Sequence, residues 1–206
     1  MPLATTTQRT QALALLERRG MARLSDMIRA GITSTTVARL ERDGAIVRLS
    51  RGLYQLPDAP IDVNHSLAEA AQLVPRGVVC LVSALAFHDL TDQQPARIWM
   101  AIGPKSWRPR VTQPPIRFVR FSPTALRTAI KPHLIEGVTV RVTEPARTII
   151  DLFRYRRRVG QTVAVDGLKE ALRRRRVTPS EIARLARDFK IARLVAPYLE
   201  ALTADG

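Results

Sequence analysis

Cysteine is nearly absent from this 206-residue sequence, which contains only Cys80. A single thiol excludes an intramolecular disulfide and any zinc site that needs several cysteines. Cys80 lies in the apolar run Val78–Val82, so we expect a buried and unreactive side chain. The three histidines are widely spaced and lack the separations typical of metal ligands: His65, His88 and His133. We therefore expect neither a metal centre nor a cofactor.

Long apolar runs are also missing. No stretch approaches the ~18 consecutive apolar residues that a membrane-spanning helix requires. The first eleven residues, MPLATTTQRTQ, do not show the basic-then-apolar order of a secretory signal. The hydrophobic content of 46% is nevertheless sufficient for a folded core. We expect a soluble cytoplasmic protein with no membrane partner.

Acidic residues are few in relation to basic ones. The chain has 33 Lys and Arg against 18 Asp and Glu, which gives a formal net charge of +15. The segment from Gln93 to Ile135 contains no acid at all, although it carries eight basic residues. Such a balance predicts affinity for a polyanion. The alternative is an arginine-rich composition in which exposed side chains only keep the protein soluble.

The most informative stretch is Thr33–Pro57, which reads TSTTVARLERDGAIVRLSRGLYQLP. Its first half predicts a short helix with Thr33 or Ser34 as the N-cap and with Gly44 just beyond its end. The second half alternates apolar and polar residues on either side of Ser50–Gly52. A glycine-containing turn between two such runs predicts a β-hairpin.

Two further helices are predicted before this stretch. Thr7–Arg19 has amphipathic spacing, a second helix begins at Asp26–Arg29, and Ala30–Ile32 forms the turn before the third helix. Three helices followed by a hairpin are typical of a winged helix-turn-helix, which we place at residues 1–58.

In a winged helix-turn-helix the third helix enters the major groove of DNA, and the hairpin reaches the phosphates or the adjacent minor groove. The candidate DNA-binding residues are Ser34, Thr35, Thr36, Arg39, Arg42, Arg48, Ser50, Arg51 and Gly52. The competing interpretation is a three-helix interaction module whose arginines only solubilise it.

A short proline-containing joint, Asp58–Asp62, precedes a second predicted domain at residues 62–206. Its strands are predicted at 78–82, 98–102, 116–121 and 137–142, and its helices at 66–73, 84–90, 146–156, 163–175, 182–189 and 192–202. Ser66 with Glu69 predicts a capping box for the first helix, and Ser83 is the predicted cap of the second. The fold class is therefore α+β: a winged helix-turn-helix, then a mixed α/β domain that ends in helices.

The second domain carries most of the positive charge. The candidate basic surface consists of Lys105, Arg108, Arg110, Arg117, Arg120, Arg147 and Arg157. Flanking DNA, RNA and an acidic protein partner all fit such a surface. Trp107 could stack on a base, but we expect it to pack over the joint between the two domains instead. Glu144, Arg147 and Asp151 have the spacing of an ion-pair network on or before one helix, and the alternative is that they form the functional core of the second domain.

No strong catalytic constellation is present. His88 beside Asp89 is explained by a histidine at a helix end, and nothing in the sequence places a base near Ser83. Asp188–Lys190 resembles part of a nuclease metal site, but it falls on a predicted helix instead of a strand. We expect a protein that is not an enzyme.

Three motifs resemble the AbiEi-type antitoxins, which are transcriptional regulators of type IV toxin-antitoxin systems. Residues 44–57 (GAIVRLSRGLYQLP) resemble the hairpin of that family's N-terminal domain. Residues 83–91 (SALAFHDLT) and 144–152 (EPARTIIDL) resemble parts of its second domain. The resemblance implies a repressor of its own operon, paired with a nucleotidyltransferase-like toxin that it counters without an obligatory stable complex.

These observations together predict a sequence-specific repressor that binds double-stranded operator DNA as a monomer or weak dimer and serves as an antitoxin. Two rivals come from other classes: a DNA-targeted nuclease, and an RNA-binding module that uses the basic second domain. Incubation with plasmid and magnesium separates the first rival from a repressor, and competition between structured RNA and duplex DNA separates the second.

Overall fold

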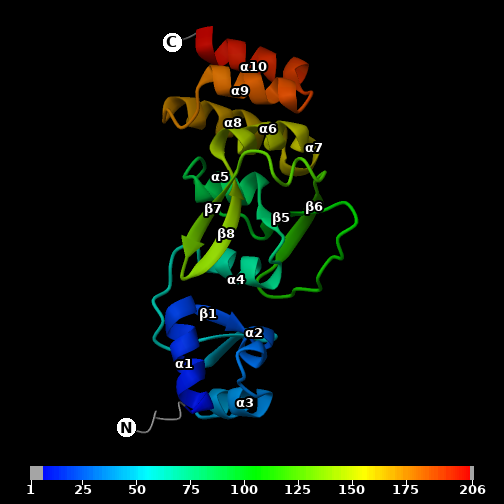
Figure 1. Ribbon diagram of the computed structural model, residues 1–206. Coiled ribbons are helices and arrows are strands. Elements are labelled where there is room, and N and C mark those ends of the chain that lie inside the picture. The colour runs from blue at the N-terminus through cyan, green and yellow to red at the C-terminus, as the bar shows by residue number, and fades with distance from the viewer. Residues whose placement is uncertain (1–6, 205–206) are drawn as a thin grey trace, which may run out of the picture. The chain divides into compact units, whose positions relative to one another are not determined.

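The computed structural model describes residues 7–204 (Figure 1). Residue contacts divide the chain into two compact units. The first unit contains residues 1–75, 111–114 and 133–140, and the second contains residues 76–110, 115–132 and 141–206. The architecture is α+β, as predicted, with helices first, then strands, then helices.

The first unit begins with the predicted order of three helices and a hairpin. Its elements are α1 (Gln8–Arg19), β1 (Met21–Arg23), α2 (Leu24–Arg29), α3 (Ser34–Arg42), β2 (Val47–Ser50) and β3 (Leu53–Gln55). The strands form an antiparallel sheet in the order β1-β3-β2. This is the arrangement of a winged helix-turn-helix, in which β2 and β3 form the wing.

Apolar side chains from α1, α2 and α3 meet in the core of this unit. Leu16 of α1, Met27 of α2, and Val37 and Leu40 of α3 are all buried. Gly44 follows α3 with φ of +70°, and its N–H donates to the carbonyl of Glu41. The predicted helix stop is therefore confirmed, because glycine adopts this left-handed conformation without strain.

Helix α4 (His65–Leu73) also belongs to the first unit, and its predicted capping box is wrong. The helix begins at His65, and no side chain caps it. Glu136 instead holds the segment before the helix, because its carboxylate accepts from the backbone N–H of Asp62 at 2.6 Å and lies 2.7 Å from Nδ1 of His65. A residue 71 positions away from His65 thus contacts the start of α4 without capping it.

The larger sheet has five strands in the order β6-β5-β4-β8-β7. They are β4 (Val78–Val79), β5 (Ile98–Ile102), β6 (Ile116–Arg120), β7 (Ile130–Ile135) and β8 (Val138–Thr143). Strand β5 pairs parallel to β6 and antiparallel to β4, and β4 pairs parallel to β8. Residues 133–140, at the tip of the β7–β8 hairpin, are assigned to the first unit. Strand β7 was not predicted, because Pro132 interrupts it and its residues do not alternate between apolar and polar.

The predicted strand at 78–82 is too long, because α5 (Leu81–Phe87) begins within it. Ser83 is therefore not a cap: it lies inside α5, and its hydroxyl accepts from the N–H of Trp99 at 2.9 Å. A continuous apolar run does not distinguish a buried strand from a buried helix. Cys80 is fully buried, as predicted, and burial raises the pKa of its thiol.

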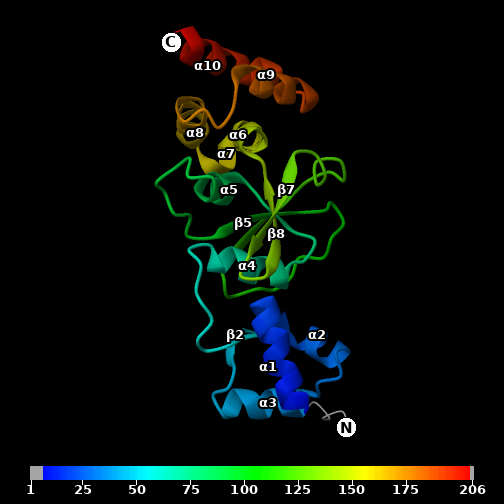
Figure 2. The same ribbon diagram turned by 60° about the vertical axis from the view of Figure 1, so that its left-hand side comes forward.

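The chain ends in helices packed around α6 (Pro145–Arg154). After α7 (Arg156–Val159) come α8 (Gln161–Arg173), α9 (Pro179–Asp188) and α10 (Ala192–Ala204). Helix α6 contacts α5, α8 and α9, and Figures 1 and 2 show α8, α9 and α10 following beyond it. Thr178 and Glu181 form a reciprocal capping box at the start of α9.

Arg147 lies in the core of the second unit instead of on the predicted basic surface. Its side chain is 1% exposed, and its Nε donates to Oδ2 of Asp151 at 3.0 Å. The spacing of four residues on α6 brings the two side chains together, which confirms the predicted ion pair. Burial raises the pKa of Asp151 to about 6, against the opposing effect of the Arg147 charge.

The guanidinium of Arg147 has further partners besides Asp151. Its Nη1 donates to the carbonyls of Ala125 at 3.1 Å and Thr128 at 2.7 Å. The group also lies 4.0 Å from the ring centre of Phe189 and 5.2 Å from that of Phe121. Stacking and hydrogen bonding together compensate for the loss of water around the charge.

Removing one member of this pair should destabilise the second unit. Arg147→Met leaves the Asp151 carboxylate buried without its partner, so we expect a loss of about 3–5 kcal/mol in the free energy of unfolding. Adding Asp151→Leu should restore most of it, because an apolar pair needs no partners. Urea unfolding followed by tryptophan fluorescence measures this, since both tryptophans lie in the second unit.

The exposed Arg157→Ala is the control, and it should change the free energy of unfolding by less than about 0.5 kcal/mol. Equal stability of the single and double variants would contradict the importance of the ion pair.

Candidate nucleic-acid interface

Helix α3 has one face in the core and one face in solvent. Val37 and Leu40 are buried, whereas four of the predicted DNA-binding residues on this helix are exposed: Ser34, Thr35, Arg39 and Arg42. Thr33 is the N-cap, and its hydroxyl accepts from the N–H of Thr36 at 3.2 Å. The cap fixes the first turn of the helix and leaves the exposed face unobstructed.

Thr36 differs from the other predicted residues of α3, because it is only 9% exposed. Its hydroxyl donates to Oε1 of Gln8 at 2.8 Å, and the same oxygen accepts from the N–H and the hydroxyl of Thr33. Thr36 therefore points toward α1 instead of outward, and it holds α3 in place. The role of Gln8 was not predicted, because 25 or more residues separate it from its partners and no local pattern links them.

The wing presents the remaining predicted residues. Arg48 and Arg51 are exposed, whereas Ser50 and Gly52 are half-buried. Gly52 has φ of +72°, which a turn of this kind requires of its glycine. The pairing of β2 with β3 shifts between Arg48 and Ser50, so a bulge lies beside the turn.

The charges of this surface are available to a partner. Within residues 7–204, no carboxylate forms an ion pair with the four exposed arginines of α3 and the wing, which are Arg39, Arg42, Arg48 and Arg51. Arg48 makes one contact within the wing, from its Nε to the carbonyl of Ser50 at 3.3 Å. Four unpaired cations on one small unit create a positive potential that attracts polyanions.

The second unit carries a separate set of exposed basic residues. Six of the seven predicted members of the basic surface are exposed: Lys105, Arg108, Arg110, Arg117, Arg120 and Arg157. Trp107 lies among them and is 76% exposed, so the expectation that it packs within the protein is wrong. An exposed indole among cations is a feature of surfaces on which bases stack.

Two of these arginines also stiffen the surface. Arg120 donates from Nη1 to the carbonyls of Gly103 and Ser106, both at 2.6 Å, and so holds the loop that follows β5. The guanidinium of Arg117 lies 4.4 Å from the ring centre of Trp99 on the neighbouring strand. Both contacts retain the positive charge, because neither partner is an acid.

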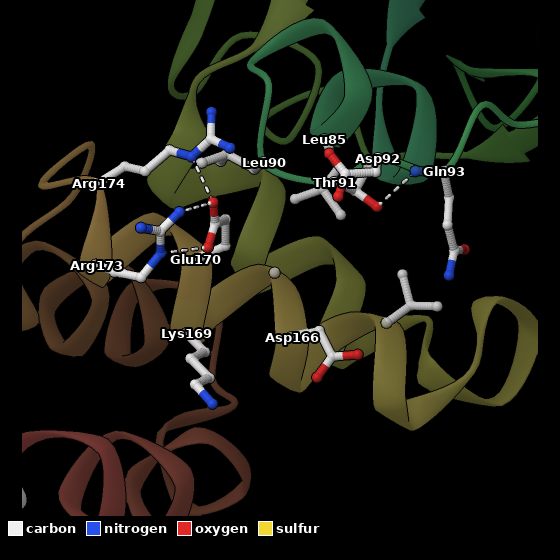
Figure 3. A pocket seen from close by; sticks show the side chains of 12 residues that line it. Leu85, Leu90, Thr91, Asp92, Gln93, Asp166, Lys169, Glu170, Arg173 and Arg174 are labelled. Carbon is white, nitrogen blue, oxygen red and sulfur yellow. Dashed lines mark hydrogen bonds and ion pairs between the residues drawn. The ribbon is translucent and has the colours of Figure 1, made fainter.

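A cavity of about 550 Å³ lies between α8 and the end of α5 (Figure 3). Leu85 and Leu90 form part of its apolar wall, and Glu170 bonds both Arg173 and Arg174 at its rim. These bonds lower the pKa of Glu170 to about 2. The rim therefore carries an ion-pair cluster of Glu170 with two arginines.

Within residues 7–204, no three His, Cys, Asp or Glu side chains gather in a way that could hold a metal ion. Asp188, from the nuclease-like triplet of the sequence, lies at the end of α9 and is 3.7 Å from Arg184. Its position on a helix and its ion pair explain it as a surface residue.

A basic winged helix-turn-helix joined to an α/β unit is the architecture of a transcriptional regulator. Two family models match the chain: "Transcriptional regulator, AbiEi antitoxin" over residues 11–57, and "AbiEi antitoxin C-terminal domain" over residues 77–197. The second match alone spans more than half of the chain, so the protein belongs to the AbiEi antitoxin family. The resemblance seen in the sequence motifs is thereby confirmed.

Among solved structures, the RV2827C protein from Mycobacterium tuberculosis has a similar fold, with a TM-score of 0.60 and 16% sequence identity. The match covers 96% of this chain and 80% of that one. No curated protein matches the sequence. None of the helices within residues 7–204 combines the length and the apolar composition needed to cross a bilayer.

Proposed function

We propose that this protein is a sequence-specific repressor that binds double-stranded operator DNA, regulates its own operon and acts as the antitoxin to a nucleotidyltransferase-like toxin. The observation that carries the proposal is the set of unpaired arginines on the exposed faces of α3 and the wing. Membership of the AbiEi antitoxin family supports the pairing with a toxin. A role on operator DNA places the protein in the cytoplasm.

The proposed contacts follow from exposure and chemistry. Helix α3 enters the major groove, where Arg39 and Arg42 donate to base edges and Ser34 and Thr35 reach bases or phosphates. The wing lies on the backbone, where Arg48 and Arg51 neutralise phosphates and the small residues at its turn, Ser50 and Gly52, allow close approach. Thr36 supports α3 from the protein side without touching DNA.

Residues 1–58 are the proposed DNA-binding domain and residues 62–206 the proposed antitoxin domain. We assign two tasks to the second domain: neutralisation of the toxin, and additional phosphate contacts through its exposed basic residues. The protein binds its operator as a monomer or weak dimer. RNA remains the competing polyanion for this surface, because Trp107 stands exposed among arginines.

Substitution of Arg39 and of Arg51 should distinguish contacts with DNA bases from contacts with the DNA backbone. Arg39→Ala should cost about 1–3 kcal/mol on the specific site alone, whereas Arg51→Ala should weaken binding to all duplexes alike. Fluorescence anisotropy with a specific and a scrambled duplex, at one salt concentration, measures both effects. If the Arg39 variant binds operator DNA as tightly as the parent, this residue does not read bases.

The basic surface of the second domain has its own test. If Lys105 and Arg110 contact phosphates, Lys105→Ala/Arg110→Ala should reduce the slope of log K against log[salt] by about two. Arg193→Ala, an exposed arginine of α10 outside the proposed surface, is the matched control. An unchanged slope in the double variant would remove this surface from the DNA contacts, and competition with structured RNA then tests the alternative ligand.

Toxin neutralisation should not depend on operator binding. We expect Arg39→Ala to lose repression of a reporter placed under the promoter of its own operon. The same variant should still restore growth to cells that express the nucleotidyltransferase-like protein encoded beside it, because neutralisation is assigned to residues 62–206. If Arg39→Ala loses both repression and the ability to restore growth, the assignment of the two functions to separate domains is contradicted.

A further inference from the structure

Gln8 begins α1, and its side-chain oxygen faces the first turn of α3. Oε1 accepts three hydrogen bonds: from the N–H of Thr33 at 3.2 Å, from the Thr33 hydroxyl at 3.0 Å and from the Thr36 hydroxyl at 2.8 Å. Figure 2 shows the start of α1 beside α3. One amide oxygen thus ties together the N-cap and the third residue of the helix that carries Arg39 and Arg42.

These bonds also determine the direction of the amide nitrogen. A backbone N–H can only donate, so the Gln8 atom that faces Thr33 must be the oxygen. The NH₂ group therefore points away from Thr33 and Thr36. Within residues 7–204 it finds no hydrogen-bond acceptor, and the Gln8 side chain is only half-buried. Two oriented N–H donors consequently remain beside the N-terminus of α3.

We propose that the Gln8 amide donates to a phosphate of duplex DNA next to the bases that α3 reads. This inference rests on the proposed function. Side-chain amides and helix N-termini are common phosphate donors in protein–DNA interfaces. Because the same side chain grips α3 through its oxygen, the phosphate contact and the placement of the base-reading helix depend on one residue. Gln8 therefore positions α3 and, in the proposed complex, also contacts the DNA backbone.

Glutamate at this position separates the two roles of the amide. Gln8→Glu retains an oxygen for Thr33 and Thr36, but it replaces the N–H donors with an acceptor that repels phosphate. An acid in the first turn of a helix is favourable, so the variant should fold normally. The matched control is Gln11→Glu, which adds the same charge to an exposed residue one turn further along α1.

Two duplexes serve as probes: one of about 30 base pairs that the parent protein selects from a random pool, and a scrambled version. We expect Gln8→Glu to bind both about ten-fold more weakly, with an unchanged thermal unfolding midpoint, because a lost hydrogen bond to a charged group has this magnitude. Gln11→Glu should change binding less than three-fold. Gln8→Ala also removes the oxygen that holds α3. This variant should therefore in addition reduce the ratio of the affinities for the selected and the scrambled duplex.

Binding of Gln8→Glu within three-fold of the parent would overturn the inference, and so would an equal weakening by Gln11→Glu. If Arg39→Ala loses specific binding under the same conditions, the proposed function stands even when the Gln8 inference fails. Failure of the parent protein to bind either duplex would overturn both.

Discussion

Helix α3 has to be anchored on one side and free on the other, and the first unit is built to meet both conditions. Val37 and Leu40 bury one face in the core, and Thr36 binds Gln8 at the helix start. Because these anchors fix the rotation of the helix about its axis, Arg39 and Arg42 are directed to solvent. A rotation of the helix by one residue would bury a guanidinium and expose an apolar side chain, which the free energy of burial prevents.

The core of the second unit contains a buried pair of opposite charges. Arg147 and Asp151 belong to a segment that resembles the AbiEi antitoxins, and they are buried among aromatic rings and carbonyl groups. This motif is therefore a structural centre around which α6 meets its neighbours, and its charges do not reach the surface. The exposed positive charge of the unit comes from other residues, on the strands, loops and helices around this core.

Local patterns predicted the first unit well, because its helices and hairpin each carry their own signals. The stop at Gly44 and the turn at Ser50–Gly52 could be predicted, and the N-cap could be narrowed to Thr33 or Ser34, since each of these signals acts on neighbouring residues. The failures share one cause. Gln8 with Thr36 and Glu136 with His65 are partners separated by 28 and 71 residues, and no single-sequence periodicity records such contacts.

Within the site, the exposed arginines followed from amphipathic spacing, whereas the placement of Thr36 and Arg147 did not. Both were assigned to a surface because their side chains are polar, and both are buried because a distant group satisfies them. Strand β7 and the start of α5 were misjudged for a related reason: pairing with other strands and packing against other elements decided their conformation, against the local pattern.

The loop after β5 is tied by Arg120 to carbonyl oxygens instead of to carboxylates. Short bonds to neutral acceptors are little affected by dissolved ions, whereas attraction between exposed charges and a polyanion fades as ionic strength rises. If this surface binds a nucleic acid, as we propose, high salt should release the ligand while the loop keeps its shape. Because the loop does not have to refold, the same surface could bind the nucleic acid again as soon as the salt is diluted.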